Sequence, residues 1–135
     1  HDAYGLGHIR RSSRILAALA ERRSDASLLL ITGAPFNDLM RGLPRNADIV
    51  KIPTIVTSGD PDKRPSMLNM GVAELAALRG EIARRTLAAF EPDVVLVDNF
   101  PVGVRLELLP ALRALRNGPT RTVEGRFRRE RHATV

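Results

Sequence analysis

Apolar positions recur along the chain with two different spacings, which predict alternating helices and strands. Apolar side chains follow a helical stripe in three segments: 9–22, 70–90 and 102–116. Short, almost continuous apolar runs predict strands in three others: 27–32, 47–52 and 93–98. The first of these runs is typical of a strand buried on both faces. Helices and strands in alternation predict an α/β fold with a parallel sheet and flanking helices.

Individual residues give this pattern more detail. In the 70–90 helix we expect four core residues: Leu75, Leu78, Ile82 and Leu87. In the 102–116 helix Glu107 is expected on the surface, and Pro110 is expected to break or kink the helix. Residues 54–69 are rich in polar and turn-forming residues and predict a loop.

Ligands of parallel α/β sheets bind beyond the carboxyl ends of the strands. Four loops are expected at that edge: 2–8, 33–38, 53–65 and 98–103. They should converge on one cleft.

The first of these loops contains Gly5-Leu6-Gly7-His8, directly before a helix. Glycines let the backbone turn sharply and approach a ligand closely. The helix start presents unpaired N–H groups and the positive end of its dipole. His8 is a candidate general base because histidine exchanges protons near neutral pH. The segment predicts a site for a phosphorylated or otherwise polar small molecule, with Gly5 and Gly7 as binding residues.

Arg11 and Asp98 are further candidates for substrate binding. Arg11 lies about one turn beyond His8 on the same helix face and could hold a phosphate or carboxylate; a solvated surface arginine is the alternative. Asp98 ends the clearest strand and could orient a substrate hydroxyl or pair with His8. Capping the next helix is the alternative for Asp98, and an exposed or capping role is the alternative for His8.

The residues do not predict a cofactor. The third glycine of a G-x-G-x-x-G dinucleotide loop is replaced by Arg10, and the next strand ends in Thr32-Gly33 rather than in an acidic residue. No carboxylate pair has the spacing of metal ligands. The absence of cysteine excludes disulfides and thiolate metal sites.

The net charge of +6 is uneven along the chain. Residues 117–135 carry five arginines and two glutamates, a net +3, which leaves +3 for residues 1–116. We predict a domain over 1–116 and a basic, disordered or aberrant tail over 117–135. A small basic module that binds nucleic acid or another anion is an alternative, but no specific nucleic-acid partner is expected. No apolar run is long enough to cross a membrane, and peripheral membrane contact is not indicated, so a cytoplasmic location is predicted.

Three blocks resemble, in this order, the N-terminal half of predicted bacterial glycosyltransferases: HDAYGLGHIRRSSRILAAL, LLLITGAP and PDVVLVDNFPVGVRLELLPAL. These enzymes are relatives of the lipid-linked N-acetylglucosaminyl transferases of peptidoglycan synthesis. The resemblance covers residues 1–116 and implies a GT-B fold of two Rossmann-like halves. The N-terminal half binds a hydroxyl acceptor and the C-terminal half binds a nucleotide-sugar donor. His8 is implied as, or near, the general base that deprotonates the acceptor.

The chain departs from that family in two places. The family's glycine-rich loop follows a first strand, which is missing here and would lie between the strands at 28–32 and 93–97. The likeness also ends after Arg116. We therefore expect an N-terminal fragment of a glycosyltransferase, inactive in isolation. A sugar-nucleotide epimerase or hydrolase on the same scaffold is the alternative.

Overall fold

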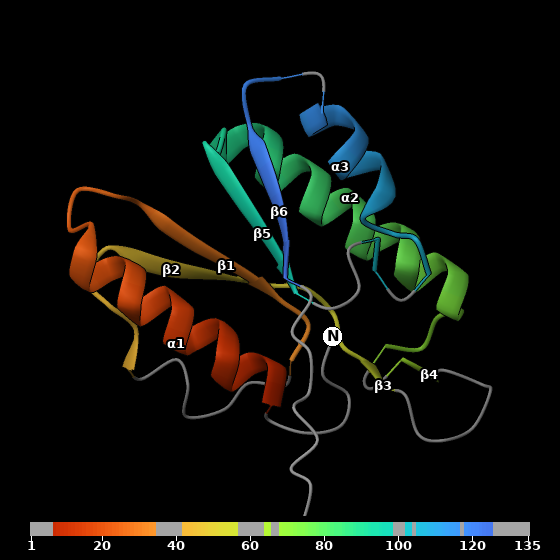
Figure 1. Cartoon of the computed structure of the whole chain (residues 1–135). Coiled ribbons are helices and arrows are strands. Elements are labelled where there is room, and N and C mark those ends of the chain that lie inside the picture. Colours follow the sequence, from red (N-terminus) through yellow and green to blue (C-terminus); the bar gives the residue numbers. More distant parts are fainter. Residues whose placement is uncertain are drawn as a thin grey trace, which may run out of the picture.

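The computed structural model describes residues 7–34, 42–56, 64–65, 68–98, 102–103, 105–116 and 118–125 (Figure 1). The helices are α1 (Gly7–Arg22), α2 (Val72–Phe90) and α3 (Leu109–Arg116). The strands are β1 (Leu28–Thr32), β2 (Ala47–Lys51), β3 (Ile55–Val56), β4 (Arg64–Pro65), β5 (Val94–Asp98) and β6 (Arg121–Gly125). The predicted mixed α/β class is confirmed. No helix in the described ranges is long and apolar enough to span a membrane.

The strands form three separate two-stranded sheets. β1 and β2 are parallel, with Leu28 opposite Ala47, and β5 and β6 are parallel, with Val94 opposite Arg121. β3 and β4 form a short antiparallel pair within the segment predicted as a loop. Among the described residues no strand pairing joins β1–β2 to β5–β6, so the predicted parallel sheet is divided into two pairs (Figure 1).

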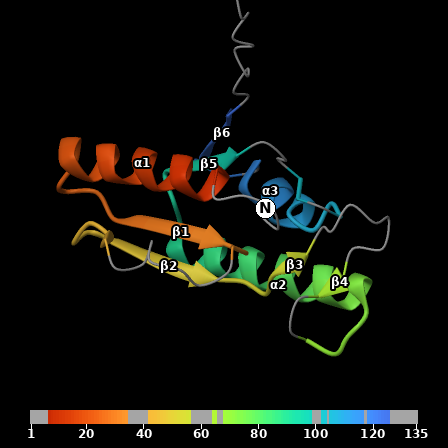
Figure 2. The ribbon, with the colours of Figure 1, turned by 90° about the horizontal axis from the view of Figure 1, so that it is seen from below.

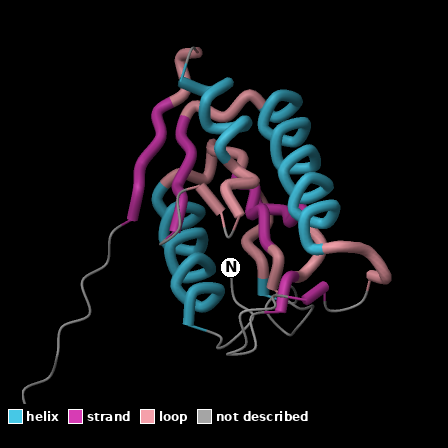
Figure 3. Tube along the Cα trace, turned by 90° about the vertical axis from the view of Figure 1, so that its right-hand side faces the viewer, coloured by secondary structure: helices cyan, strands magenta, loops and turns pink. Residues whose placement is uncertain are grey.

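Helix α1 packs along β1 through its buried residues Ile9 and Leu16. Figure 2 shows α1, β1 and β2 side by side in that order, and Figure 3 shows strands between two long helices. The five residues of β1 are nevertheless only half-buried, so the predicted full burial of this strand is wrong. The physical reason is that β1 has a hydrogen-bonded neighbour, β2, on one edge only among the described strands.

Helix α2 packs against α3, and α3 contacts β6. The buried face of α2 passes through Leu75, Arg79 and Ala83, which are spaced one turn apart. Leu78 is rotated away from this face and is 39% exposed, so its predicted place in the core is wrong. The helix ends at Glu91 in a left-handed conformation, where the backbone N–H donates to the Leu87 carbonyl, directly before Pro92.

The predicted helix over 102–116 is shorter in the structure. Residues 102–103 and 105–108 form turns, with positive φ at Gly103 (86°) and Leu106 (61°). Pro110 does not kink α3 but lies in its first turn, where the N–H that proline lacks would have no helical partner.

The C-terminal segment contains a strand that was not predicted. Residues 121–125 pair with β5, and the Arg121 N–H donates to the Asp93 carbonyl at 2.9 Å. These five residues lie within the stretch 117–135 that was predicted to be a disordered or aberrant tail. The pairing depends on backbone groups of a distant strand, which side-chain periodicity does not reveal. Residues 126–135 lie outside the described residues.

Candidate functional site

His8, Arg11 and Asp98 form one hydrogen-bonded cluster. His8 is the second residue of α1, and Asp98 is the last residue of β5. The His8 Nδ1 atom lies 2.9 Å from Asp98 Oδ2, and Arg11 Nη1 donates to Asp98 Oδ1 at 3.0 Å. Three roles were considered for Asp98: orienting a substrate hydroxyl, pairing with His8 and capping the next helix. The structure shows the contact with His8. Helix capping is not the role of Asp98 in the described residues, because α3 begins at Leu109.

The local sequence explains how the cluster is assembled. His8 and Arg11 are three residues apart in one helix and therefore lie on the same face. Helix α1 packs on β1, and its first turn meets the carboxyl end of β5. The cluster consequently lies at the edge where ligands of parallel α/β proteins bind.

The cluster is open to solvent. The side chains of His8, Arg11 and Asp98 are 34%, 37% and 24% exposed. Gly7 begins α1, and a Cβ at this position would meet no atom of the described residues within 4 Å. Gly5, the other glycine predicted to bind substrate, lies outside the described residues.

The Asp98 carboxylate determines which histidine nitrogen carries the proton. An ionised carboxylate only accepts hydrogen bonds, so it accepts the proton of Nδ1 and leaves the lone pair on Nε2. Arg11 donates to the other carboxylate oxygen and holds its orientation. The arrangement can take a proton from a bound hydroxyl at Nε2 while Asp98 stabilises the imidazolium that forms.

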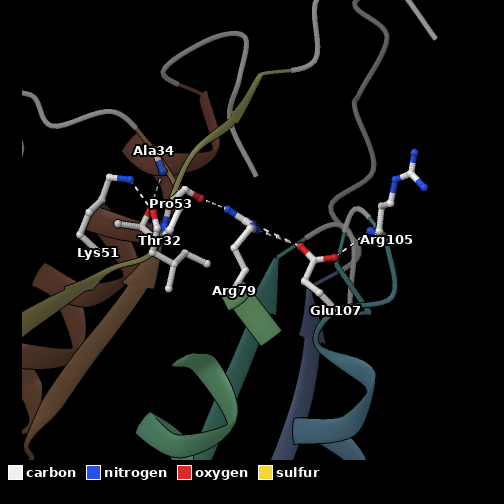
Figure 4. A network of polar contacts seen from close by, with 8 residues as sticks. Thr32, Ala34, Lys51, Pro53, Arg79, Arg105 and Glu107 are labelled. Carbon is white, nitrogen blue, oxygen red and sulfur yellow. Dashed lines mark hydrogen bonds and ion pairs between the residues drawn. The ribbon is translucent and has the colours of Figure 1, made fainter. Parts of the chain in front are cut away.

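A second, buried cluster surrounds Arg79 (Figure 4). Arg79 donates to Glu107 Oε1 from Nη2 at 3.2 Å and from Nε at 3.4 Å, and its Nη1 donates to the Pro53 carbonyl. Glu107 Oε2 accepts the Arg105 N–H at 2.7 Å. The Arg79 and Glu107 side chains are 3% and 1% exposed. Burial lowers the pKa of Arg79, and Glu107 opposes that shift.

The expectation that Glu107 is a surface residue is wrong, and Arg79 was not identified as a functional candidate. Glu107 is buried because its carboxylate has a charged partner, Arg79 of helix α2, which compensates its loss of solvation. One signal in the sequence could have indicated Arg79. It stands one turn after Leu75 and one turn before Ala83, on the apolar face of the helix.

Lys51 lies beside the second cluster, at the end of β2 (Figure 4). Its Nζ donates to the Ile52 carbonyl at 2.5 Å and to Thr54 Oγ1 at 3.0 Å. Burial, and after it the charge of Arg79, lower the pKa of the Lys51 amine. Gly33, which follows β1, and Pro53, which follows β2, both lie against Arg79.

Two further features of the structure bear on ligand binding. A groove of about 430 Å³ between α2 and the start of α3 is lined by Ala76, Gly80, Arg105 and Pro110, among others, and by none of the predicted site residues. In the part of the chain that the structure describes, no group of three or more potential metal-ligating side chains is present.

Comparison of the chain with protein-family models, with curated proteins and with solved structures finds no match. The proposed function therefore rests on the sequence and on the geometry of the cluster formed by His8, Arg11 and Asp98.

Proposed function

We propose that this chain is the acceptor-binding, Rossmann-like part of a glycosyltransferase, with His8 as the general base. The observation that carries the proposal is the 2.9 Å contact between His8 Nδ1 and Asp98 Oδ2 at the carboxyl end of β5. The resemblance of residues 1–116 to predicted bacterial glycosyltransferases supports the reaction class. It also supports a nucleotide sugar and a hydroxyl compound as the two partners.

The reaction would begin with removal of a proton from the acceptor hydroxyl. His8 Nε2 accepts this proton as the acceptor oxygen forms a bond to the anomeric carbon of the donor sugar. The bond between that carbon and the diphosphate oxygen breaks, and the nucleoside diphosphate leaves. Asp98 stabilises the imidazolium through Nδ1. Proton transfer by a positioned base contributes roughly 10²–10⁴-fold to such a reaction.

Anionic groups of the substrates would bind beside His8. The first turn of α1 presents backbone N–H groups and the positive end of the helix dipole. Arg11 adds a guanidinium group, which suits a phosphate or carboxylate. Among the described residues no atom lies within 4 Å of a Cβ at Gly7, which suits a close approach of a substrate phosphate to the backbone. This environment favours an acceptor or donor that carries a phosphate near the reacting hydroxyl.

The experiment is a sugar-transfer assay on the full-length gene product with a panel of nucleotide sugars and hydroxyl acceptors. We expect transfer by the wild-type protein and strongly reduced transfer by His8→Ala. Asp93→Asn, at the opposite end of β5 from Asp98, is the matched control and should leave turnover unchanged. Undiminished turnover of His8→Ala would remove His8 from the mechanism. Conversion of the donor without any acceptor would favour the epimerase or hydrolase instead.

A further inference from the structure

His8 and Asp98, the residues of the proposed catalytic pair, are attached to two different strand pairs. His8 lies on α1, which packs against β1, whereas Asp98 ends β5. Among the described residues no backbone ladder connects these two strand pairs. Because no such ladder fixes the distance between His8 and Asp98 in the described residues, side chains that join the two strand pairs can set it.

Arg79 makes such a connection. Its helix, α2, is joined to the β5–β6 pair through α3, which contacts both α2 and β6. The Arg79 guanidinium reaches the other strand pair, where it donates to the Pro53 carbonyl just beyond β2. A Cβ at Gly33, directly after β1, would stand 2.6 Å from Arg79 Nη1. Arg79 thus lies against the ends of both β1 and β2 (Figure 4).

Glu107 connects the same guanidinium to the segment that follows β5. It accepts from Arg79 at Oε1 and from the Arg105 N–H at Oε2. A Cβ at Gly103 would stand 2.4 Å from Glu107 Oε2, so this turn is closed around the carboxylate. Gly103 also has a φ of 86°, a conformation that glycine adopts without strain. Glu107 therefore holds the turn at Gly103 and Arg105, five to seven residues after Asp98.

We propose that Arg79 and Glu107 are positioning residues for the His8–Asp98 pair. By binding the ends of β1 and β2 to the turn after β5, they hold the Asp98 carboxylate within hydrogen-bond distance of His8 Nδ1. The importance of this pair for catalysis rests on the proposed function, but the geometric relationship does not. If the buried ion pair only stabilised the packing of α2, its loss would leave the His8–Asp98 hydrogen bond intact.

The experiment reads the tautomer of His8 by ¹⁵N NMR of the full-length gene product labelled at histidine. A neutral histidine bonded to Asp98 must carry its proton on Nδ1, so the tautomer reports the hydrogen bond directly. The His8 signal is assigned as the one lost in His8→Asn, and Asp98→Ala supplies the reference for a broken pair. We expect the Nδ1–H form in the wild type, at a pH where the ring is neutral.

The test variants are Arg79→Met and Glu107→Gln, with folding monitored by the dispersion of amide signals. In both, the Nδ1–H form should fall from the main species to a minor one. The matched control is Arg84→Met, on the same helix, because the Arg84 side chain is 40% exposed and pairs with Glu81. It should keep the wild-type tautomer.

Three results would overturn the proposal: retention of Nδ1–H in a folded Arg79→Met or Glu107→Gln protein, loss of Nδ1–H in Arg84→Met, or its absence in the wild type. If Arg79→Met does not fold, Glu107→Gln, which keeps the shape of the side chain, decides the test. Failure of sugar transfer in a wild type that shows the Nδ1–H form would overturn the proposed function alone.

Discussion

The His8 ring and the Asp98 carboxylate meet at 2.9 Å although 90 residues separate them in the chain. One begins a helix and the other ends a strand of a different strand pair. Asp98 also accepts a hydrogen bond from Arg11. The three residues predicted separately from the sequence, His8, Arg11 and Asp98, therefore form one hydrogen-bonded cluster.

Asp98→Asn should lower the kcat of sugar transfer by about 10²–10⁴-fold with a smaller change in KM. The amide can no longer stabilise the imidazolium that forms when His8 accepts a proton, and this effect belongs to the transition state. Steady-state kinetics of the full-length gene product provide the measurement. A variant with wild-type kcat would show that the contact has no catalytic role.

Arg79→Met should destabilise the protein by about 3–5 kcal/mol, because it leaves the buried Glu107 carboxylate without its charged partner. Arg84→Met should change the free energy of unfolding far less, since its ion pair with Glu81 is exposed. Urea denaturation measures both values. The double variant Arg79→Met/Glu107→Met should lose less than the sum of the single variants. Similar losses in Arg79→Met and Arg84→Met would contradict the buried pair.

Gly103→Ala should cost about 2–5 kcal/mol of stability. Its φ of 86° is unfavourable for alanine, and the added Cβ would overlap the Glu107 carboxylate. Gly42→Ala is the control, because a Cβ there meets nothing within 4 Å among the described residues. Thermal unfolding of the two variants should therefore differ clearly. Equal midpoints would mean that the turn is not closed around Glu107.

Leu75→Ala should cost about 2–5 kcal/mol, whereas Leu78→Ala should cost less than about 1 kcal/mol. The two leucines are three residues apart in α2, but Leu75 is 0% exposed and Leu78 is 39% exposed. Chemical denaturation distinguishes them. A larger loss of stability for Leu78→Ala than for Leu75→Ala would show that Leu78 belongs to the core, as the helical periodicity predicted.

The pKa of Glu81 should be about 2, because hydrogen bonds from Arg84 and then Arg85 stabilise its charged form. Since the folded-state pKa is lowered from 4.5, the contribution of Glu81 to stability is present above about pH 4.5. It is lost as the pH falls through about 2. A ¹³C NMR titration of the carboxyl group gives the value, and Arg84→Met should raise it. A midpoint near 4.5 in the wild type would contradict these contacts.

The periodicity of apolar residues predicted the bounds of several elements to within one or two residues. The strand predicted at 93–98 is Val94–Asp98, and the helix predicted at 70–90 is Val72–Phe90. Both depend on side-chain patterns within one segment, which the sequence displays directly. The buried face of that helix was harder to predict, because Arg79 takes a core position that Leu78 was expected to fill. An arginine can occupy such a position only when a distant carboxylate compensates its charge.

The sequence by itself determined that a helix lies at the candidate site and that His8 and Arg11 share one face, because the spacing of helical residues depends only on local geometry. The predicted start at residue 9 was wrong, because α1 begins at Gly7 and includes His8. The sequence also placed Asp98 at the end of a strand. Only the tertiary structure decided that Asp98 contacts both residues, that Glu107 is buried against Arg79, and that residues 121–125 pair with β5. These relationships join segments far apart in the chain, and their energies depend on desolvation and backbone pairing, which exist only after those segments have packed together.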